Sequence, residues 1–182
     1  MTIQAVVKMG NTQLATPSLP VTDFSDAALP GIIQDMQDTM NATRGIGIAA
    51  PQIGHNLRIV MFGFESNTRY PNEKSVPFTI VINPVIEILT DVMVEDWEGC
   101  LSVPGLRGLV PRYTKIRYHG YDLDGEVISR EAHDFHARLV QHECDHLDGI
   151  LFPRRIRDLQ YFGYEEELRH IIWPEESSDG KK

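Results

Sequence analysis

The sequence has few cysteines, and their scarcity bounds how the chain is stabilised. Only two occur among 182 residues, Cys100 and Cys144. Disulfides are rare in reducing compartments, and a chain of this length buries a core large enough to stand without them. Each thiol therefore needs its own explanation.

We expect one domain over residues 1–182, with a leader at 1–20 and a flexible tail at 173–182.

Long apolar runs and an excess of basic residues are also missing. Residues 1–8 contain no apolar segment typical of a signal peptide, and no later run approaches the roughly 18 apolar residues of a membrane span. We therefore expect a cytoplasmic protein.

The 17 basic residues are outnumbered by 26 acidic ones, and the net charge is -9. This balance argues against nucleic acid or an anionic membrane as the main partner.

Hydrophobic periodicity predicts a mixed helix and strand fold. Apolar residues repeat at helical spacing over 29–40, which predicts a helix with Ser25 as its N-cap and a stop at 41–45. Strands are predicted at 58–64, 78–83, 86–94 and 115–121, with 127–130 returning as a hairpin partner after a turn at 123–125. An exposed loop is predicted at 65–77.

A stretch of small residues, Gly45-Ile46-Gly47-Ile48-Ala49-Ala50-Pro51-Gln52, leaves little side-chain bulk over its backbone. It lacks the third glycine of a dinucleotide-binding loop, and no apolar strand precedes it. We interpret it as an extended edge that pairs with a peptide-like ligand, with the Gln52 amide directed into a site. A tight packing turn is the alternative.

The segment Gln141-His142-Glu143-Cys144-Asp145-His146 is an H-E-x-x-H motif. On a helix, the two His side chains are offset by only about 40°, so both rings reach one metal ion, while the carboxylate of Glu143 lies about 100° away. A carboxylate beside a metal is placed to act as general base and then as general acid. The alternative is an ordinary helix whose histidines are buried or solvated.

Cys100, in the segment 98–105, is the natural candidate for a third metal ligand. Cys144 is a poorer candidate, because at about 200° from His142 it points away from the histidine pair and toward the core. A buried structural cysteine is the alternative interpretation of Cys100, since cysteine is among the most buried residue types.

Three motifs occur together in order: Gly-Ile-Gly-Ile-Ala-Ala-Pro-Gln at 45–52, Glu-Gly-Cys-Leu-Ser at 98–102, and Gln-His-Glu-Cys-Asp-His at 141–146. In these motifs the sequence resembles the peptide deformylase family. The resemblance implies an α+β fold in which antiparallel strands surround the H-E-x-x-H helix. It also implies hydrolysis of the N-formyl group on the initiator methionine of nascent polypeptides, with release of formate.

The resemblance further implies a role for each matched residue. The metal ligands are Cys100, His142 and His146, and Glu143 moves the proton. Gln52 and the backbone N–H of Leu101 stabilise the developing negative charge. Glu98 and Arg107 belong to the polar frame of the site. The positions near the methionine pocket or the peptide-pairing edge are Gly45, Ile46, Gly47, Gly99 and Leu139. The implied metal is Fe(II), with Ni(II), Co(II) or Zn(II) as substitutes.

Some features depart from the family. Arg138 and the loop 65–77 are expected to alter access to the pocket. Relatives often end in a basic helix that can dock on the ribosome. Here the end is acidic, which argues against docking through it; the acidic residues are Glu165, Glu166, Glu167, Glu175 and Glu176.

Two other functions stay open on sequence grounds. One is a zinc peptidase that takes Glu166 as its third ligand. The other is a non-catalytic, metal-stabilised binding module, against which the intact Glu143 and Gln52 argue.

Overall fold

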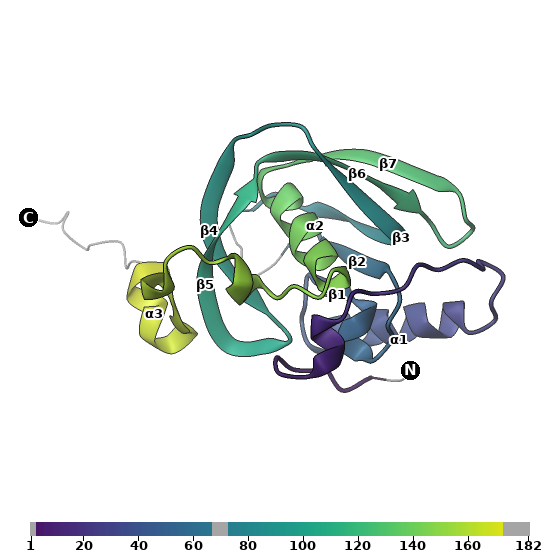
Figure 1. Ribbon diagram of the computed structural model, residues 1–182, viewed down its shortest axis with the longest axis horizontal. Helices are drawn as coiled ribbons and strands as arrows, with labels where there is room; N and C mark the ends of the chain where they lie inside the picture. The colour runs from purple at the N-terminus through teal and green to yellow at the C-terminus, as the bar shows by residue number, and fades with distance from the viewer. Residues whose placement is uncertain (1–2, 67–72, 173–182) are drawn as a thin grey trace, which may run out of the picture.

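The computed structural model describes residues 3–66 and 73–172, and its fold combines helices with two antiparallel sheets (Figure 1). The tail predicted at 173–182 and the middle of the loop predicted at 65–77 lie outside the described residues. The prediction of an α+β fold with antiparallel strands is confirmed.

The larger sheet has five strands in the order β1-β2-β3-β6-β7, and all neighbours are antiparallel. Their bounds are β1 Gly47–Ala49, β2 Ile59–Phe64, β3 Val76–Ile88, β6 Lys115–Tyr121 and β7 Val127–His133. The smaller sheet has the order β4-β5-β8, with β4 at Met93–Cys100, β5 at Val103–Tyr113 and β8 at Phe162–Tyr164.

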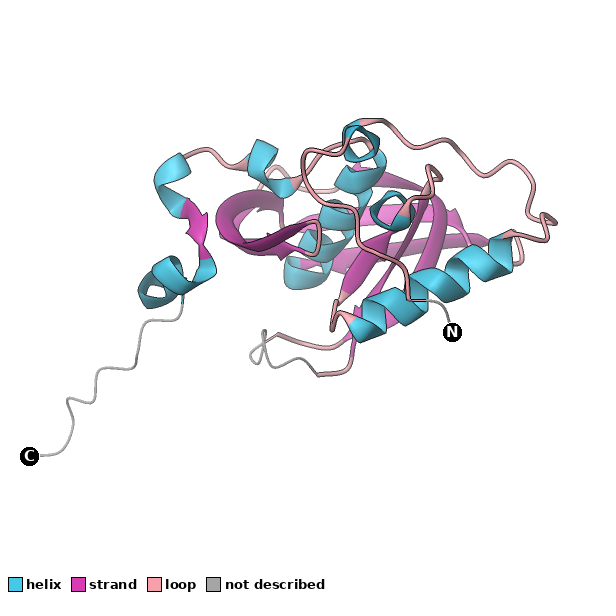
Figure 2. Ribbon diagram, turned by 90° about the horizontal axis from the view of Figure 1, so that it is seen from below, coloured by secondary structure: helices cyan, strands magenta, loops and turns pink. Residues whose placement is uncertain are grey.

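The described α-helices are α1 at Leu29–Ala42, α2 at Asp134–Leu147 and α3 at Glu165–Ile172. Short 3₁₀ helices occur at Thr12–Ala15, Ala50–Ile53, Phe152–Arg155 and Leu159–Tyr161. Figure 2 shows α1 lying along the outside of the strands, and α3 set apart beside the smaller sheet. Within the described part of the chain, no helix combines the length and apolar character needed to cross a membrane.

The helix α2 is the central element of the fold (Figure 1). Every residue from Ala137 to Leu147 is buried. One face packs against the larger sheet, where Cys144 and Leu147 join a core cluster with Phe62 and Tyr118. Cys144 therefore lies in the core, as its helical angle predicts. The opposite face carries His142 and His146 toward the end of β4.

Three secondary-structure predictions were wrong in detail. The helix α1 begins at Leu29, as predicted, but its N-cap is Ala28, because the hydroxyl and the backbone N–H of Ser25 both donate to Asp23 Oδ1 in a turn. The segment 86–94 is not one strand, since Ile88 ends β3 and Met93 begins β4. The strand β3 itself continues through Asn83 and Pro84 by a bulge.

Candidate metal centre

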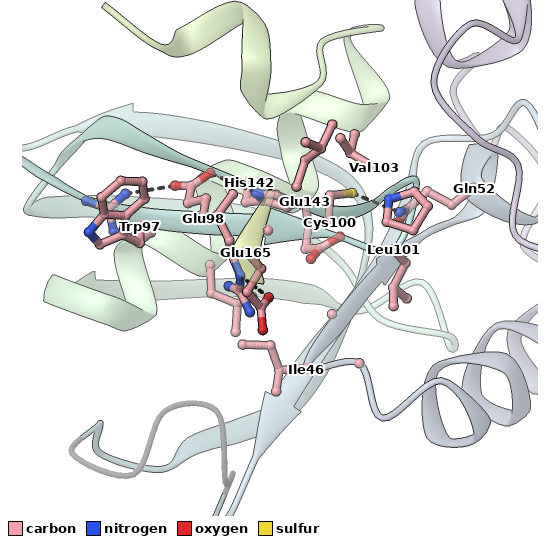
Figure 3. Close-up of a pocket in the computed structure, with 18 of the residues that line it drawn as sticks. Ile46, Gln52, Trp97, Glu98, Cys100, Leu101, Val103, His142, Glu143 and Glu165 are labelled. Carbon is pink, nitrogen blue, oxygen red and sulfur yellow. Dashed lines mark hydrogen bonds and ion pairs between the residues drawn. The ribbon is translucent and has the colours of Figure 1, made fainter. Parts of the chain in front are cut away.

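Cys100 and the two histidines of the H-E-x-x-H motif form one cluster of ligand atoms. Figure 3 shows two of its members, Cys100 and His142, at the cavity. Cys100 ends β4, while His142 and His146 lie one turn apart on α2. Their ligand atoms all lie within 4.8 Å of one another, and Cys100 Sγ is 3.3 Å from His146 Nε2. One thiolate and two imidazoles are a ligand set that suits a divalent transition metal. The donor chemistry and the spacing therefore fit a metal ion.

Glu98 orients the first histidine. Its Oε2 lies 2.9 Å from His142 Nδ1, which leaves Nε2 of the ring for the cluster. The Glu98 side chain is buried and accepts two hydrogen bonds from Arg112, at 2.9 and 3.0 Å. Burial alone would raise the pKa of Glu98, but the Arg112 guanidinium and the hydrogen bond with His142 hold that pKa well below its usual range. Glu98 is therefore an ionised acceptor.

Two buried arginines complete the frame around Glu98. Arg112 also donates to Asp145 Oδ2 at 2.6 Å, which ties β5 to α2. Arg138 donates to Glu98 Oε1 at 2.8 Å and to the backbone carbonyls of Val94 and Val110, at 2.6 and 2.8 Å. Sequence analysis missed Arg112, because its carboxylate partners lie in other elements. Arg138 was noted only as a departure from the family, and the structure gives it a bonding role as well as a place in the cavity wall.

The two histidines differ in their preferred protonation. Burial lowers the pKa of His146 well below its ordinary value, so this ring is neutral, the form that binds a metal. Burial also opposes charge on His142, but hydrogen bonds with Cys100 and Glu98 raise its pKa well above the ordinary value. Metal binding at this site must therefore displace a proton.

Glu143 lies beside the cluster without belonging to it. Its side chain is buried, and its Oε2 has no hydrogen-bond partner among the described residues. Burial raises the pKa of Glu143 to about 7. A carboxylate with a pKa near the operating pH is well suited to accept and return a proton.

The amide of Gln52 has a fixed orientation. Its Oε1 accepts the backbone N–H of Ala49 at 2.8 Å, so its NH₂ group faces the cluster. That group donates to Ser102 Oγ at 3.1 Å and to Cys100 Sγ at 3.5 Å. Ser102 is fully buried and was not singled out from the sequence. A side-chain donor is therefore held next to the thiol.

A cavity of about 290 Å³ opens onto this cluster. All the residues that the resemblance places in the site line this cavity, except His146, which lies deeper and has only 1% of its surface exposed. The lining residues among them are Gly45, Ile46, Gly47, Gln52, Glu98, Gly99, Cys100, Leu101, Arg107, Leu139, His142 and Glu143. Trp97, Phe135 and Glu165 also line the cavity, and no sequence pattern placed them there.

Glu166, the third ligand of the peptidase alternative, lies elsewhere. It is exposed on α3 and is not a member of the ligand cluster. Its neighbour Glu165 pairs with Arg107 rather than with a histidine. The described structure thus brings Cys100, and not Glu166, to the histidine pair.

Comparison with known proteins gives consistent results. The profile of the polypeptide deformylase family matches residues 3–161. Peptide deformylase 1 of Nitrosomonas europaea is 57% identical over 166 residues, covering 91% of this chain and 94% of that protein. Peptide deformylase 2 of Ralstonia nicotianae is 55% identical over 173 residues, covering 95% of this chain and 96% of that protein.

Solved structures agree with these sequence matches. The Met-Ala-Ser-bound class I type b peptide deformylase of Acinetobacter baumannii superposes with a TM-score of 0.82 at 36% identity, covering 85% of this chain and 99% of that one. The peptide deformylase of Thermotoga maritima gives a TM-score of 0.77 at 31% identity, covering 87% and 100%.

Proposed function

The chain belongs to the polypeptide deformylase family, whose members remove the N-formyl group from nascent chains. We propose how the residues of this chain perform that reaction. Cys100, His142 and His146 hold one divalent metal ion, and the formyl group of an N-formylmethionyl peptide is hydrolysed beside it. One observation carries this proposal: three ligand atoms within 4.8 Å of one another stand beside Glu143, a buried carboxylate with an unpartnered oxygen.

The bound metal would supply a hydroxide nucleophile near neutral pH by lowering the pKa of a coordinated water. Glu143 accepts the proton that this water loses. It later returns the proton to the amine that leaves when the C–N bond of the formamide breaks, so the products are formate and a free N-terminus. A pKa of about 7 allows Glu143 to act in both directions.

Gln52 and Leu101 stabilise the negative charge that develops on the formyl oxygen. The Gln52 NH₂ group already faces the cluster, because Ala49 and Ser102 fix the amide. The backbone N–H of Leu101 is the second donor. Donors of this kind typically contribute about 3 to 4 kcal/mol each.

The remaining cavity residues bind the peptide. Its extended backbone pairs along the edge formed by Gly45, Ile46 and Gly47, while Gly99 and Leu139 line the space for the methionine side chain. Methionine as the first residue is in keeping with the Met-Ala-Ser ligand of the Acinetobacter baumannii relative.

The working metal in this proposal is Fe(II), with Ni(II) and Co(II) as good surrogates and Zn(II) as a poorer one. The ligand set does not select iron, since the general affinity order places zinc above it. The choice rests on the family and on coordination number, because zinc usually favours four ligands in such sites. Ferrous iron and the Cys100 thiolate are both oxidised by air, so the activity of the iron form should decay aerobically.

The nascent chain in the cytoplasm is the proposed partner. The first turn of α3 contains Glu165, Glu166 and Glu167, which disfavours docking on ribosomal RNA through this end of the chain. Ribosome association therefore does not form part of the proposed mechanism.

Two variants test the proposed roles. Glu143→Gln should keep the metal and lose most turnover, whereas Cys100→Ala should lose metal affinity. Both are measured by metal content and by formate release from a formyl-methionyl peptide. If Cys100→Ala kept full metal and activity while Glu166→Ala lost both, the peptidase alternative would replace this one.

Substrate and metal are tested separately. Formyl peptides should react far faster than the same peptides carrying an acetyl group, because the added methyl crowds the attacking water. Anaerobic reconstitution with one equivalent of each ion then ranks the metals. A zinc form as fast as the iron form would refute the choice of iron and leave deformylation standing.

A further inference from the structure

One wall of the catalytic cavity is built by a segment that lies beyond the family match. The match ends at residue 161, immediately before β8 and α3. The strand β8 pairs with the edge of β5, with Gly163 opposite Arg107. This pairing brings Glu165, the first residue of α3, to the cavity, which it lines (Figure 3).

Glu165 forms an ion pair with a cavity residue but keeps part of its carboxylate accessible. Arg107 Nε donates to Glu165 Oε2 at 2.8 Å. The Arg107 side chain is only 6% exposed, whereas that of Glu165 is 45% exposed. The guanidinium lies against the backbone of Gly99, where an added Cβ would come within 3.0 Å of it. The positive charge is thus covered, whereas the Glu165 side chain lines the cavity and stays partly exposed.

The neighbouring charges make this wall acidic. Glu166 and Glu167 follow in the same helical turn, and both are exposed. A cationic side chain that reaches this wall can share the carboxylate of Glu165, while an anionic one is repelled by Glu165 and, at longer range, by the two exposed carboxylates that follow it. Arg44 also lines the cavity, but it comes from the turn between α1 and β1, on a different wall.

We propose that Glu165 is a specificity-determining residue, which favours formyl-methionyl peptides with lysine or arginine just after the methionine and disfavours those with aspartate or glutamate there. This inference rests on the proposed function. With the formyl group at Glu143, the rest of the peptide must leave through the cavity mouth, advancing about 3.3 Å per residue. Only the first residues after methionine therefore pass within reach of the Glu165 charge, given a screening length of about 8 Å in physiological salt.

The experiment compares kcat/KM on two matched peptide sets, formyl-Met-X-Ala and formyl-Met-Ala-X, with lysine, glutamine or glutamate at X. The expected order at one of the two positions is lysine, glutamine, glutamate, with a lysine-to-glutamate ratio of about 1.5 to 5, the range expected for exposed charge pairs. The difference should lie mainly in KM. The ratio should fall toward one in 1 M salt, where screening acts over about 3 Å.

Substitutions then separate Glu165 from the general acidity of α3. Glu165→Gln should lower the ratio, Glu165→Lys should invert it, and Glu165→Asp should largely retain it. Glu166→Gln is the matched control, because it removes the same charge from the same turn without lining the cavity, and it should keep the wild-type ratio.

Several outcomes would overturn the inference. An unchanged ratio in Glu165→Gln would do so, and so would an equal loss in Glu166→Gln, which would indicate a diffuse field. A preference for glutamate that disappears in Arg44→Gln would assign specificity to the other wall. Equal rates on all peptides would refute the inference alone, whereas no formate from any peptide would refute the proposed function itself.

Discussion

At Gly47 the backbone of β1 lies close against the side chain of Glu143. A Cβ placed on Gly47 would lie 2.6 Å from Glu143 Cδ and 2.9 Å from its Cγ. No side chain is compatible with the observed position of that carboxylate. The second glycine of the 45–52 motif is therefore explained by the close approach of the Glu143 carboxylate.

We predict that Gly47→Ala keeps its metal but loses about a hundredfold in kcat, because displacing a reacting group by about 1 Å has an effect of that order. Metal content and formate release on the same preparation measure the two properties. Gly31→Ala is the matched control, since a Cβ there meets nothing within 4 Å. Comparable activity in the two variants would show that Glu143 moves aside without consequence.

His136 provides a pH-dependent contribution to stability away from the metal ligands. Its ring packs against Phe62 and Tyr118. Burial, with smaller effects from the Arg130 and His133 charges, lowers the pKa of His136 below the usual 6.5. Above pH 6.5 the ring is neutral in both the folded and unfolded states. As the pH falls below 6.5, the unfolded state binds a proton that the folded state resists, so folding stability declines.

We therefore predict that wild type loses more stability than His136→Gln between pH 7 and the lowered folded pKa. Urea unfolding at a series of pH values measures the free energy of each protein. The two curves should run parallel above pH 7 and converge or cross below pH 6.5. Parallel curves throughout would mean that His136 titrates equally in the folded and unfolded states.

The sequence alone indicated those candidate site residues that belong to a recognisable motif. His142, Glu143 and Cys100 stand in short patterns whose chemistry is readable locally, and the structure brings them together. Arg112 and Glu165 stand in no such pattern. Arg112 acquires its role from carboxylates on β4 and α2, and Glu165 from a strand pairing between β8 and β5. Only the fold creates these contacts.

At the scale of elements, the errors in strand bounds have a common cause. Asn83-Pro84 is typical of a chain break, but β3 continues through it, because the Asn83 side chain bonds both backbone groups of Val21 and its φ of 52° fits a bulge. The strand β5 contains Pro104, Gly105 and Pro111, which local propensity assigns to loops. Pairing with β4 overrides that propensity.

The buried ion pairs of Arg112 connect the smaller sheet to the helix α2. Arg112 bridges Glu98 on β4 and Asp145 on α2, and all three side chains are at most 9% exposed. We predict that Arg112→Met costs up to about 3 to 5 kcal/mol of folding free energy, because it removes the buried cation that two buried carboxylates share. Each carboxylate is then left with one arginine, Arg138 for Glu98 and Arg155 for Asp145.

Arg117→Met is the matched control for this prediction. Arg117 also bridges two carboxylates, Glu87 and Glu131, but its side chain is 38% exposed. Its loss should cost at most about 1 kcal/mol. Urea unfolding of metal-free proteins compares both variants without a contribution from the ion. Equal costs would show that burial does not decide the value of these pairs.

At the scale of the whole molecule, the ligand cluster joins two parts of the chain that are also connected by packing and by buried ion pairs. Cys100 belongs to the smaller sheet, and the two histidines belong to the helix that covers the larger one. The resemblance to deformylases identified these partners despite their separation in the sequence, and the family is confirmed. Sequence patterns did not foresee that residues after 161 would return to the cavity.

Because an ion held by these three ligands binds the folded state in preference to the unfolded one, we predict that it stabilises the entire fold. At a free concentration one thousand times Kd, the stabilisation is about 4 kcal/mol. For a chain of this size each kcal/mol shifts Tm by about 2 to 4 °C, so removing the metal should lower Tm by roughly 8 to 16 °C. Calorimetry of metal-loaded and chelated wild type measures this shift. Cys100→Ala, which lacks one ligand, should show a much smaller shift at the same metal concentration. Equal Tm values for loaded and chelated wild type would contradict the prediction, because an ion that leaves the unfolding equilibrium unchanged is not held by the folded arrangement of Cys100, His142 and His146.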